Sequence, residues 1–336
     1  MLAVLEYSFN AVAPILLLSL FGYILKRKGF LKKDWLKTSN QFMFRCFLPI
    51  LLFQNVYSVG SLRDIDWGSA GFIIFALVCV TLISLATVSL CTKEQRRKGV
   101  LAQNAFRSNN AIIGIPLSEA LQINGAAALL SAMQAPSIIY FNAISVVVLS
   151  IFSEGKKANV KNILIGITKN PLIRGIVLGI VALCIREFIP RNADGTLVFS
   201  LQNNLPFLYT MLSYLARMAT PMALIVLGGQ FEFSAVKTVR KELTIGVLTR
   251  LVISPAFCFA LAFLFQAFGL LKLTPQLIAV MISIFSTPVA VSSAVMAQEM
   301  DGDEVLAGQL VVWSTLFSLL TLFLQIAAFR YFGMLG

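Results

Sequence analysis

Histidine is absent from this 336-residue chain, and charged residues make up only 12% of it. Histidine is the usual side chain of proton relays and a common ligand of zinc and haem, so its absence argues against those sites. In a soluble domain, roughly a quarter of the residues are charged. With 58% hydrophobic residues and so few charges, the chain falls into the membrane class.

Cysteine is also sparse, and no pair has the CxxC spacing of a redox or zinc motif. The five cysteines lie in or at the ends of apolar runs, at Cys46, Cys79, Cys91, Cys184 and Cys258. A free cysteine in such a place behaves as a small hydrophobic residue. The sequence therefore predicts no disulfide framework and no metal site.

Carboxylates are scarce inside the apolar runs, where Glu6, Glu119 and Glu299 all fall near the ends. A hydrolytic membrane enzyme would need a Ser–His pair, a metal site or two intramembrane aspartates, and the chain offers none of these. We therefore expect no enzyme, no catalytic residue and no cofactor. No carboxylate suggests a proton carrier either, so the sequence leaves open whether H⁺ or Na⁺ coupling applies.

The apolar runs predict ten membrane spans, because a helix needs about 20 residues to cross a hydrocarbon core of ~30 Å. The fold class is an all-α polytopic membrane protein. The spans are expected at 4–25, 36–58, 68–91, 98–121, 124–151, 171–188, 204–230, 242–268, 275–298 and 304–330.

The formal net charge of +12 comes from basic residues in short loops between these spans. Nucleic-acid binding would need a basic face on a folded soluble domain, so no nucleic-acid partner is predicted. Lysine and arginine are retained in cytoplasmic loops, and here they concentrate at 26–37, 93–98, 156–169 and 237–241. We therefore expect a multi-pass protein of the inner or plasma membrane with both termini extracytoplasmic.

Two spans are interrupted by polar or helix-breaking residues. Residues 107–116 of the fourth span read RSNNAIIGIP, and residues 286–293 of the ninth read STPVAVSS. Hydrocarbon holds no water to pair a broken backbone, so unwound spans survive only where protein or a wet cavity satisfies them. Such a pair of breaks, one in each half of the chain, predicts the binding site of a secondary transporter.

Short internal similarities divide the chain into two five-span repeats, 1–155 and 156–336. An arginine precedes a proline by four residues at Arg45 and Pro49 and again at Arg217 and Pro221. The two interruptions also align with each other. An odd number of spans in each repeat makes the halves antiparallel, which predicts an inverted repeat.

The interruptions carry the candidate binding residues. Asparagine offers both donors and acceptors, and half-helix N-termini have a partial positive charge that suits a carboxylate. The alternative is that the asparagines only bond neighbouring helices and that the proline of the fourth span only kinks it. The candidate ligands are Arg107, Ser108, Asn109, Asn110, Ser286, Thr287, Pro288 and Val289, and the candidate helix-break residues are Gly114, Pro116 and Pro288.

Four arginines lie inside predicted spans: Arg45, Arg107, Arg217 and Arg250. A central arginine costs about 2.5–3.5 kcal/mol on insertion, so each needs a partner or water. Arg107 abuts the break and is the first candidate for a charge partner of the substrate, and Arg45 and Arg217 are candidate charges of an anion cavity. The alternative is snorkelling to the interface, which suits Arg45 and Arg250 best.

Three segments together resemble the auxin efflux carrier family. NNAIIGIPL (109–117) resembles the family's NTLVMGIPL signature, TPVAVSSAVMAQEM (287–300) resembles its ninth helix, and AGQLVVWSTL (307–316) is similar to its bacterial branch. The resemblance covers essentially the whole chain. It implies a 5+5 inverted repeat with broken, crossing helices 4 and 9. It also implies elevator movement of a transport domain (spans 3–5 and 8–10) against a scaffold domain (spans 1, 2, 6 and 7).

By this resemblance Asn109 matches the substrate-facing asparagine and Pro288 matches the crossing proline of the second broken helix. Ser108 replaces the first crossing proline of plant members, and Val289 replaces a polar residue, which argues against an indole substrate. The expected substrate is a small organic anion, either a mono- or dicarboxylate such as malate or malonate or an auxin-like acid. Membrane lipid and a second copy, bound through the scaffold domain, are the other expected partners.

Two alternatives remain open. A sodium-coupled, bile-acid-type symporter shares the broken-helix design. A channel or a membrane sensor would be a different class, although a sensor usually appends a cytoplasmic output domain.

Overall fold

The structure is a computed structural model that describes residues 2–58, 66–114, 117–118, 121–153, 168–191 and 197–335. Within these ranges the regular structure is entirely helical, and no β-strand longer than an isolated bridge occurs. The prediction of an all-α chain is confirmed. Pro116, a predicted helix-break residue, lies outside the described residues.

Five helical segments in the described ranges are long and apolar enough to cross a bilayer, which agrees with a polytopic membrane protein. They are Trp67–Cys91, Ala132–Ile151, Pro206–Gln230, Arg240–Ala267 and Glu304–Tyr331. The first is α4, the second belongs to α7 (Ala126–Ile151), the third is α11 and the last is α16. The fourth joins α12 (Arg240–Leu248), a π-helical turn η5 (Thr249–Ile253) and α13 (Ser254–Ala267).

The other predicted spans coincide with further helical segments. In chain order these are α1 (Leu2–Arg27), α2 (Lys33–Phe42), η1 (Met43–Phe47), α3 (Leu48–Tyr57), α5 (Gln95–Phe106), η3 (Asn110–Gly114), α9 (Pro171–Phe188), α14 (Pro275–Met281), η6 (Ile282–Ser286) and α15 (Ser292–Glu299). Two short helices, α10 (Leu201–Asn204) and the 3-10 helix η4 (Phe233–Thr238), lie in connections.

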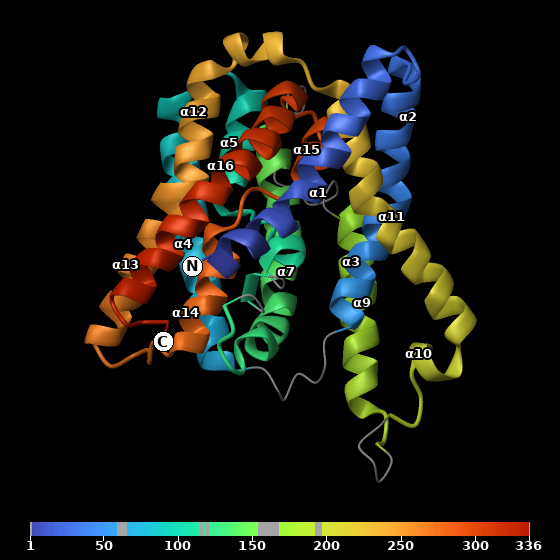
Figure 1. Cartoon of the computed structure of the whole chain (residues 1–336). Helices are drawn as coiled ribbons and strands as arrows, with labels where there is room; N and C mark the ends of the chain where they lie inside the picture. The colour runs from blue at the N-terminus through green and yellow to red at the C-terminus, as the bar shows by residue number, and fades with distance from the viewer. Residues whose placement is uncertain are drawn as a thin grey trace.

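The helices gather in two groups (Figure 1). On one side α3 packs along α9, and α11 packs against both α3 and α1. On the other side lie α4, α12, α13 and α16, while α7 contacts α3, α4, α5 and α14. Helix α1 contacts α16 as well as α11, so it joins the two groups.

Polar side chains start several helices where the sequence leaves its apolar runs. Asp66, Asn170, Ser200, Thr274 and Asp303 each accept a hydrogen bond from a backbone N–H in the first turn of the next helix. Such caps satisfy donors that have no partner within the helix. They explain why α4, α9, α10, α14 and α16 begin where they do.

Arg97 holds the helix ends together near the start of α5. Its Nε lies 3.0 Å from Asp303 Oδ2, at the start of α16, and its Nη1 lies 3.1 Å from Glu242 Oε1 in α12. Glu94 completes the set at 2.9 Å from Nε. A single guanidinium thus fixes the relative positions of the three helices at this end of the bundle.

A proline accounts for the π-helical turn η5. Pro255 has no N–H, so the carbonyl of Leu251, four residues earlier, loses its helical partner. Gln325 Nε2 of α16 donates to that carbonyl at 3.1 Å. In a membrane a freed carbonyl must find such an internal partner, and the helix therefore continues past the proline.

Helices α1 and α11 approach closely because both carry glycine at the contact. A Cβ at Gly228 would overlap the carbonyl of Ser19, and one at Gly22 would overlap the carbonyl of Ile225. Membrane helices gain most of their association energy from such close packing. The pairing of α1 with α11 therefore depends on the absence of these two side chains.

We expect Gly228→Ala to lower the stability of the protein by about 3 kcal/mol, since backbone must move to admit the methyl group. Gly71→Ala in α4 is the matched control, because a Cβ there meets nothing within 4 Å. Thermal unfolding of the purified variants measures the difference. Equal melting temperatures for the two variants would contradict the packing account.

Candidate functional site

The two interrupted segments cross each other in extended conformation. Helix α5 ends at Phe106, and Ser108 forms an isolated antiparallel bridge with Val289. The N–H of Asn109 donates to the carbonyl of Pro288 at 2.8 Å. On the other side of the bridge, the N–H of Ala290 and the carbonyl of Arg107 are 3.4 Å apart. The crossing segments thus satisfy part of each other's backbone, as the apolar surroundings require.

Side chains satisfy further backbone groups around the crossing. Ser283 Oγ donates to the carbonyl of Gly114 at 3.2 Å and so ties η6 to η3. Thr287 Oγ1 donates to the carbonyl of Ser283 at 3.0 Å. The N–H of Val289 donates to Ser314 Oγ of α16 at 3.2 Å. Two hydroxyls of the ninth span, those of Ser283 and Thr287, therefore serve the backbone.

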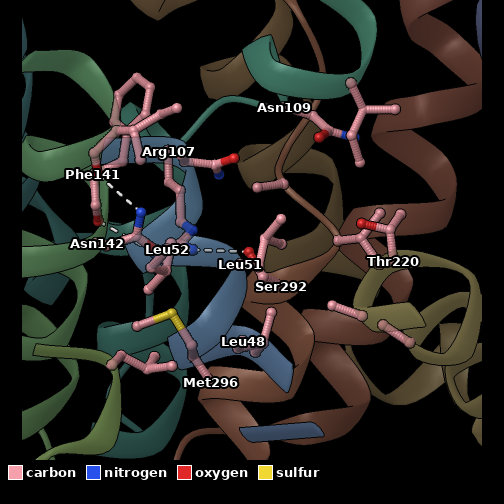
Figure 2. A pocket seen from close by; sticks show the side chains of 18 of the residues that line it. Leu48, Leu51, Leu52, Arg107, Asn109, Phe141, Asn142, Thr220, Ser292 and Met296 are labelled. Atoms are coloured by element: carbon pink, nitrogen blue, oxygen red, sulfur yellow. Dashed lines mark hydrogen bonds between the residues drawn. The ribbon is translucent and has the colours of Figure 1, made fainter. Parts of the chain in front are cut away.

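A cavity of about 200 Å³ lies beside the crossing (Figure 2). Its polar lining is Asn55, Arg107, Ser108, Asn109, Asn110, Asn142, Thr220 and Ser292. Its apolar lining is Leu48, Leu51, Leu52, Ile112, Ile138, Phe141, Leu172, Ala219, Ala223, Ala290, Val291 and Met296. The walls come from α3, α9 and α11 on one side and from the crossing, α7 and α15 on the other.

Arg107 supplies the cation of this cavity and is only 2% exposed. Its Nη1 donates to the carbonyl of Phe141 at 3.1 Å, and its Nη2 donates to Asn142 Oδ1 at 2.7 Å and to Ser292 Oγ at 2.8 Å (Figure 2). All three acceptors are neutral. No ion pair found in the described residues involves Arg107, so no carboxylate there balances this charge.

Several polar atoms of the cavity wall have no hydrogen-bond partner in the described structure. They are Arg107 Nε, Asn109 Nδ2, Asn110 Nδ2 and Ser108 Oγ. Buried polar groups are normally paired, and each exception calls for an explanation. Three of the four are N–H donors, which makes this wall complementary to an acceptor-rich ligand.

The candidate residues of the fourth span lie together, whereas those of the ninth span do not reach the cavity. Arg107, Ser108, Asn109 and Asn110 all line it. The lining of the ninth span comes instead from residues 290–292. The predicted ligands Ser286, Thr287, Pro288 and Val289 are absent from the lining. The backbone of Thr287 bonds Arg250 of η5, that of Pro288 bonds Asn109, and that of Val289 bonds Ser314 of α16.

The other arginine candidates lie elsewhere. Arg45 in η1 and Arg217 in α11 are both exposed, and neither lines the cavity. Gly114, a predicted helix-break residue, ends η3 and is buried against Ser283. The predicted concentration of arginines around one cavity is therefore reduced to Arg107.

Four polar residues of the lining were not among the candidate ligands predicted from the sequence. They are Asn55, Asn142, Thr220 and Ser292. Thr220 had a usable signal, because it precedes Pro221 in the internal repeat of spans two and seven. No sequence signal marks the leucines of α3 as cavity lining, since they resemble those of any membrane span.

We expect Asn142→Leu to lower stability by about 1–3 kcal/mol, because it removes an acceptor from a buried charged donor. Ser145→Ala is the matched control one turn further along α7, since the buried Ser145 hydroxyl has no hydrogen-bond partner in the described structure. Thermal unfolding again measures both. A loss in Ser145→Ala as large as that in Asn142→Leu would show that Asn142 does not hold Arg107.

Comparison with known proteins agrees with this architecture. A family model described as membrane transport protein matches residues 7–326, which include both interrupted helices. An uncharacterized transporter of Methanothermobacter thermautotrophicus is 24% identical over 324 residues, covering 94% of this chain and 96% of that protein. The match over nearly the whole length confirms the resemblance noted in the sequence: the chain belongs to the membrane transport protein family, the auxin efflux carrier family of transporters.

Proposed function

We propose that this transporter is a secondary carrier of a small organic anion, which it binds in the cavity beside the crossing. The observation that carries the proposal is the buried guanidinium of Arg107, which has neutral acceptors only. A cation held at membrane depth without a counter-ion is costly. An anionic ligand would supply that counter-ion.

The unpartnered donors support a carboxylate in particular. Arg107 Nε and the Nδ2 atoms of Asn109 and Asn110 belong to residues that line the cavity, and none of the three has a hydrogen-bond partner in the described structure. A carboxylate offers two oxygens with about four acceptor positions and can satisfy several donors at once. The first turn of α15, which begins at Ser292 in the same wall, adds the positive end of a helix dipole.

The remaining lining favours one carboxylate and a short apolar body. Leu48, Leu51 and Leu52 of α3 line the wall across from the crossing, and the cavity holds one cationic side chain. A second carboxylate would be buried against apolar side chains without a charged partner, which is costly. The cavity volume of about 200 Å³ is below the ~300–1,000 Å³ of pockets for drug-sized ligands, so the ligand is small. We therefore favour a monocarboxylate over malate or malonate.

Alternating access would proceed through an elevator movement of the transport domain (spans 3–5 and 8–10) against the scaffold domain (spans 1, 2, 6 and 7). In support, the cavity lies between walls from these two groups of helices. The proposal includes ten spans in two inverted repeats, 1–155 and 156–336, with helices 4 and 9 as the broken pair. It also includes extracytoplasmic termini in an inner or plasma membrane and a homodimer formed through the scaffold.

We expect Asn109→Ala to abolish anion binding while leaving the melting temperature of the ligand-free protein nearly unchanged. The reason is that Asn109 Nδ2 has no protein partner to lose in the described structure. A ligand present at 100 times its dissociation constant stabilises the folded state by about 2.7 kcal/mol. The measurement is the carboxylate-induced rise in melting temperature of wild type and variant.

Asn109→Asp is the companion variant, with nearly the same shape but an added negative charge. It should bind the anion no better than Asn109→Ala does. Undiminished carboxylate stabilisation in either variant would rule out this wall as the binding site.

Short monocarboxylates such as butyrate or benzoate should stabilise the wild-type protein more than malonate, succinate or malate at equal concentration. The physical reason is that the cavity has a single cation and that leucines of α3 make up most of the α3 wall. Butyramide is the matched neutral control and should have no effect. A larger rise in melting temperature with the dicarboxylates would overturn the preference for one charge.

A further inference from the structure

Arg250 is a second buried arginine at the crossing, and it lies on the side away from the cavity. It is only 1% exposed, and it is absent from the cavity lining. Its Nη1 donates to the carbonyl of Ala105 at 3.1 Å, and its Nε donates to the carbonyl of Thr287 at 3.1 Å. Its Nη2 donates to the carbonyl of Phe285. Snorkelling to the membrane interface, the alternative considered for this residue, is therefore wrong.

These three carbonyls belong to the C-terminal ends of the two interrupted helices. Helix α5 ends at Phe106, so the Ala105 carbonyl lies in its last turn. The π-helical turn η6 ends at Ser286, and the other two carbonyls lie on either side of that end. The last carbonyls of a helix have no partner within the helix, and they carry the negative end of its dipole. Two negative helix ends thus meet at one point.

Three carbonyl oxygens at the negative ends of two helices are suited to binding a cation. Carriers with broken helices use unwound carbonyls and half-helix C-terminal ends to coordinate Na⁺. Oxygen ligands in general suit such hard cations. In this chain all three carbonyls bond the guanidinium of Arg250, which η5 places between α5 and η6.

We propose that Arg250 is a built-in cation that occupies the position of a coupling ion behind the crossing. The crossing is then complete without Na⁺, and substrate binding does not depend on Na⁺. Only this last consequence rests on the proposed carrier function, because the stability of the crossing can be measured without any substrate. The sodium-coupled symporter is accordingly the disfavoured alternative.

The two buried arginines, Arg107 and Arg250, have different roles at the crossing. Every nitrogen of the Arg250 guanidinium donates to a backbone carbonyl, so this residue offers a ligand little. Arg107 keeps an unpartnered Nε in the cavity wall. Arg250 is therefore a positioning residue, and Arg107 is the residue that faces the substrate.

The test compares thermal unfolding of the purified protein in sodium chloride, potassium chloride and choline chloride at equal ionic strength. We expect the same wild-type melting temperature in all three. Arg250→Ala should melt about 5 °C or more below wild type. Guanidinium chloride, at low-millimolar concentrations far below those that denature proteins, should restore at least half of this loss. Arg217→Ala, which removes an exposed arginine, is the control and should show neither the loss nor the recovery.

If Arg250→Ala does not fold, a second pair of variants still tests the role of the positive charge. Arg250→Lys keeps the charge, and Arg250→Met is neutral with a similar length. The lysine variant should melt at the higher temperature of the two. A wild-type protein stabilised by Na⁺ relative to choline would overturn the proposal, and so would equal melting of the lysine and methionine variants. A chain that binds no carboxylate would refute the proposed substrate but leave these melting temperatures as expected.

Discussion

The structure depends on how two interrupted helices satisfy their backbone groups inside a membrane. Extended residues in hydrocarbon are tolerated only when protein replaces the missing water. Here Ser108 pairs with Val289, and hydroxyls of Ser283 and Ser314 take up neighbouring backbone groups. The crossing is therefore stable as protein structure before any ligand binds, and it can hold a cavity open beside it.

The crossing also determines where positive and negative charges lie around the cavity. The negative helix ends meet on one face, where Arg250 neutralises them, and the N-terminal turn of α15 begins on the other, where the cavity lies. Arg107 adds a cation to that second face and is held there by Asn142 and Ser292. In the function proposed above, the anion cavity is a consequence of the way the chain must be broken, and the leucines of α3 limit what the anion can carry.

The sequence predicted the crossing and part of the cavity lining, because those features are local. Arg107 to Asn110 are polar residues inside an apolar span, which predicts an unwound helix. All four line the cavity. Which face of an extended segment points to the cavity depends on its pairing with a distant segment. That is why Thr287 to Val289 were expected in the lining and residues 290–292 were found there. The role of Arg250 was hidden for a further reason: its partners are backbone carbonyls, which no residue type reveals.

We propose that the Arg107 face of the cavity binds a monocarboxylate. The most direct measurement is an experimental structure with a bromine-labelled monocarboxylate, such as a bromobenzoate, whose anomalous signal locates the ligand. We expect the carboxylate within hydrogen-bonding distance of Arg107 Nε and Asn109 Nδ2, with bromine toward Leu52. Bromine density outside this cavity, or a carboxylate directed away from Arg107, would contradict it.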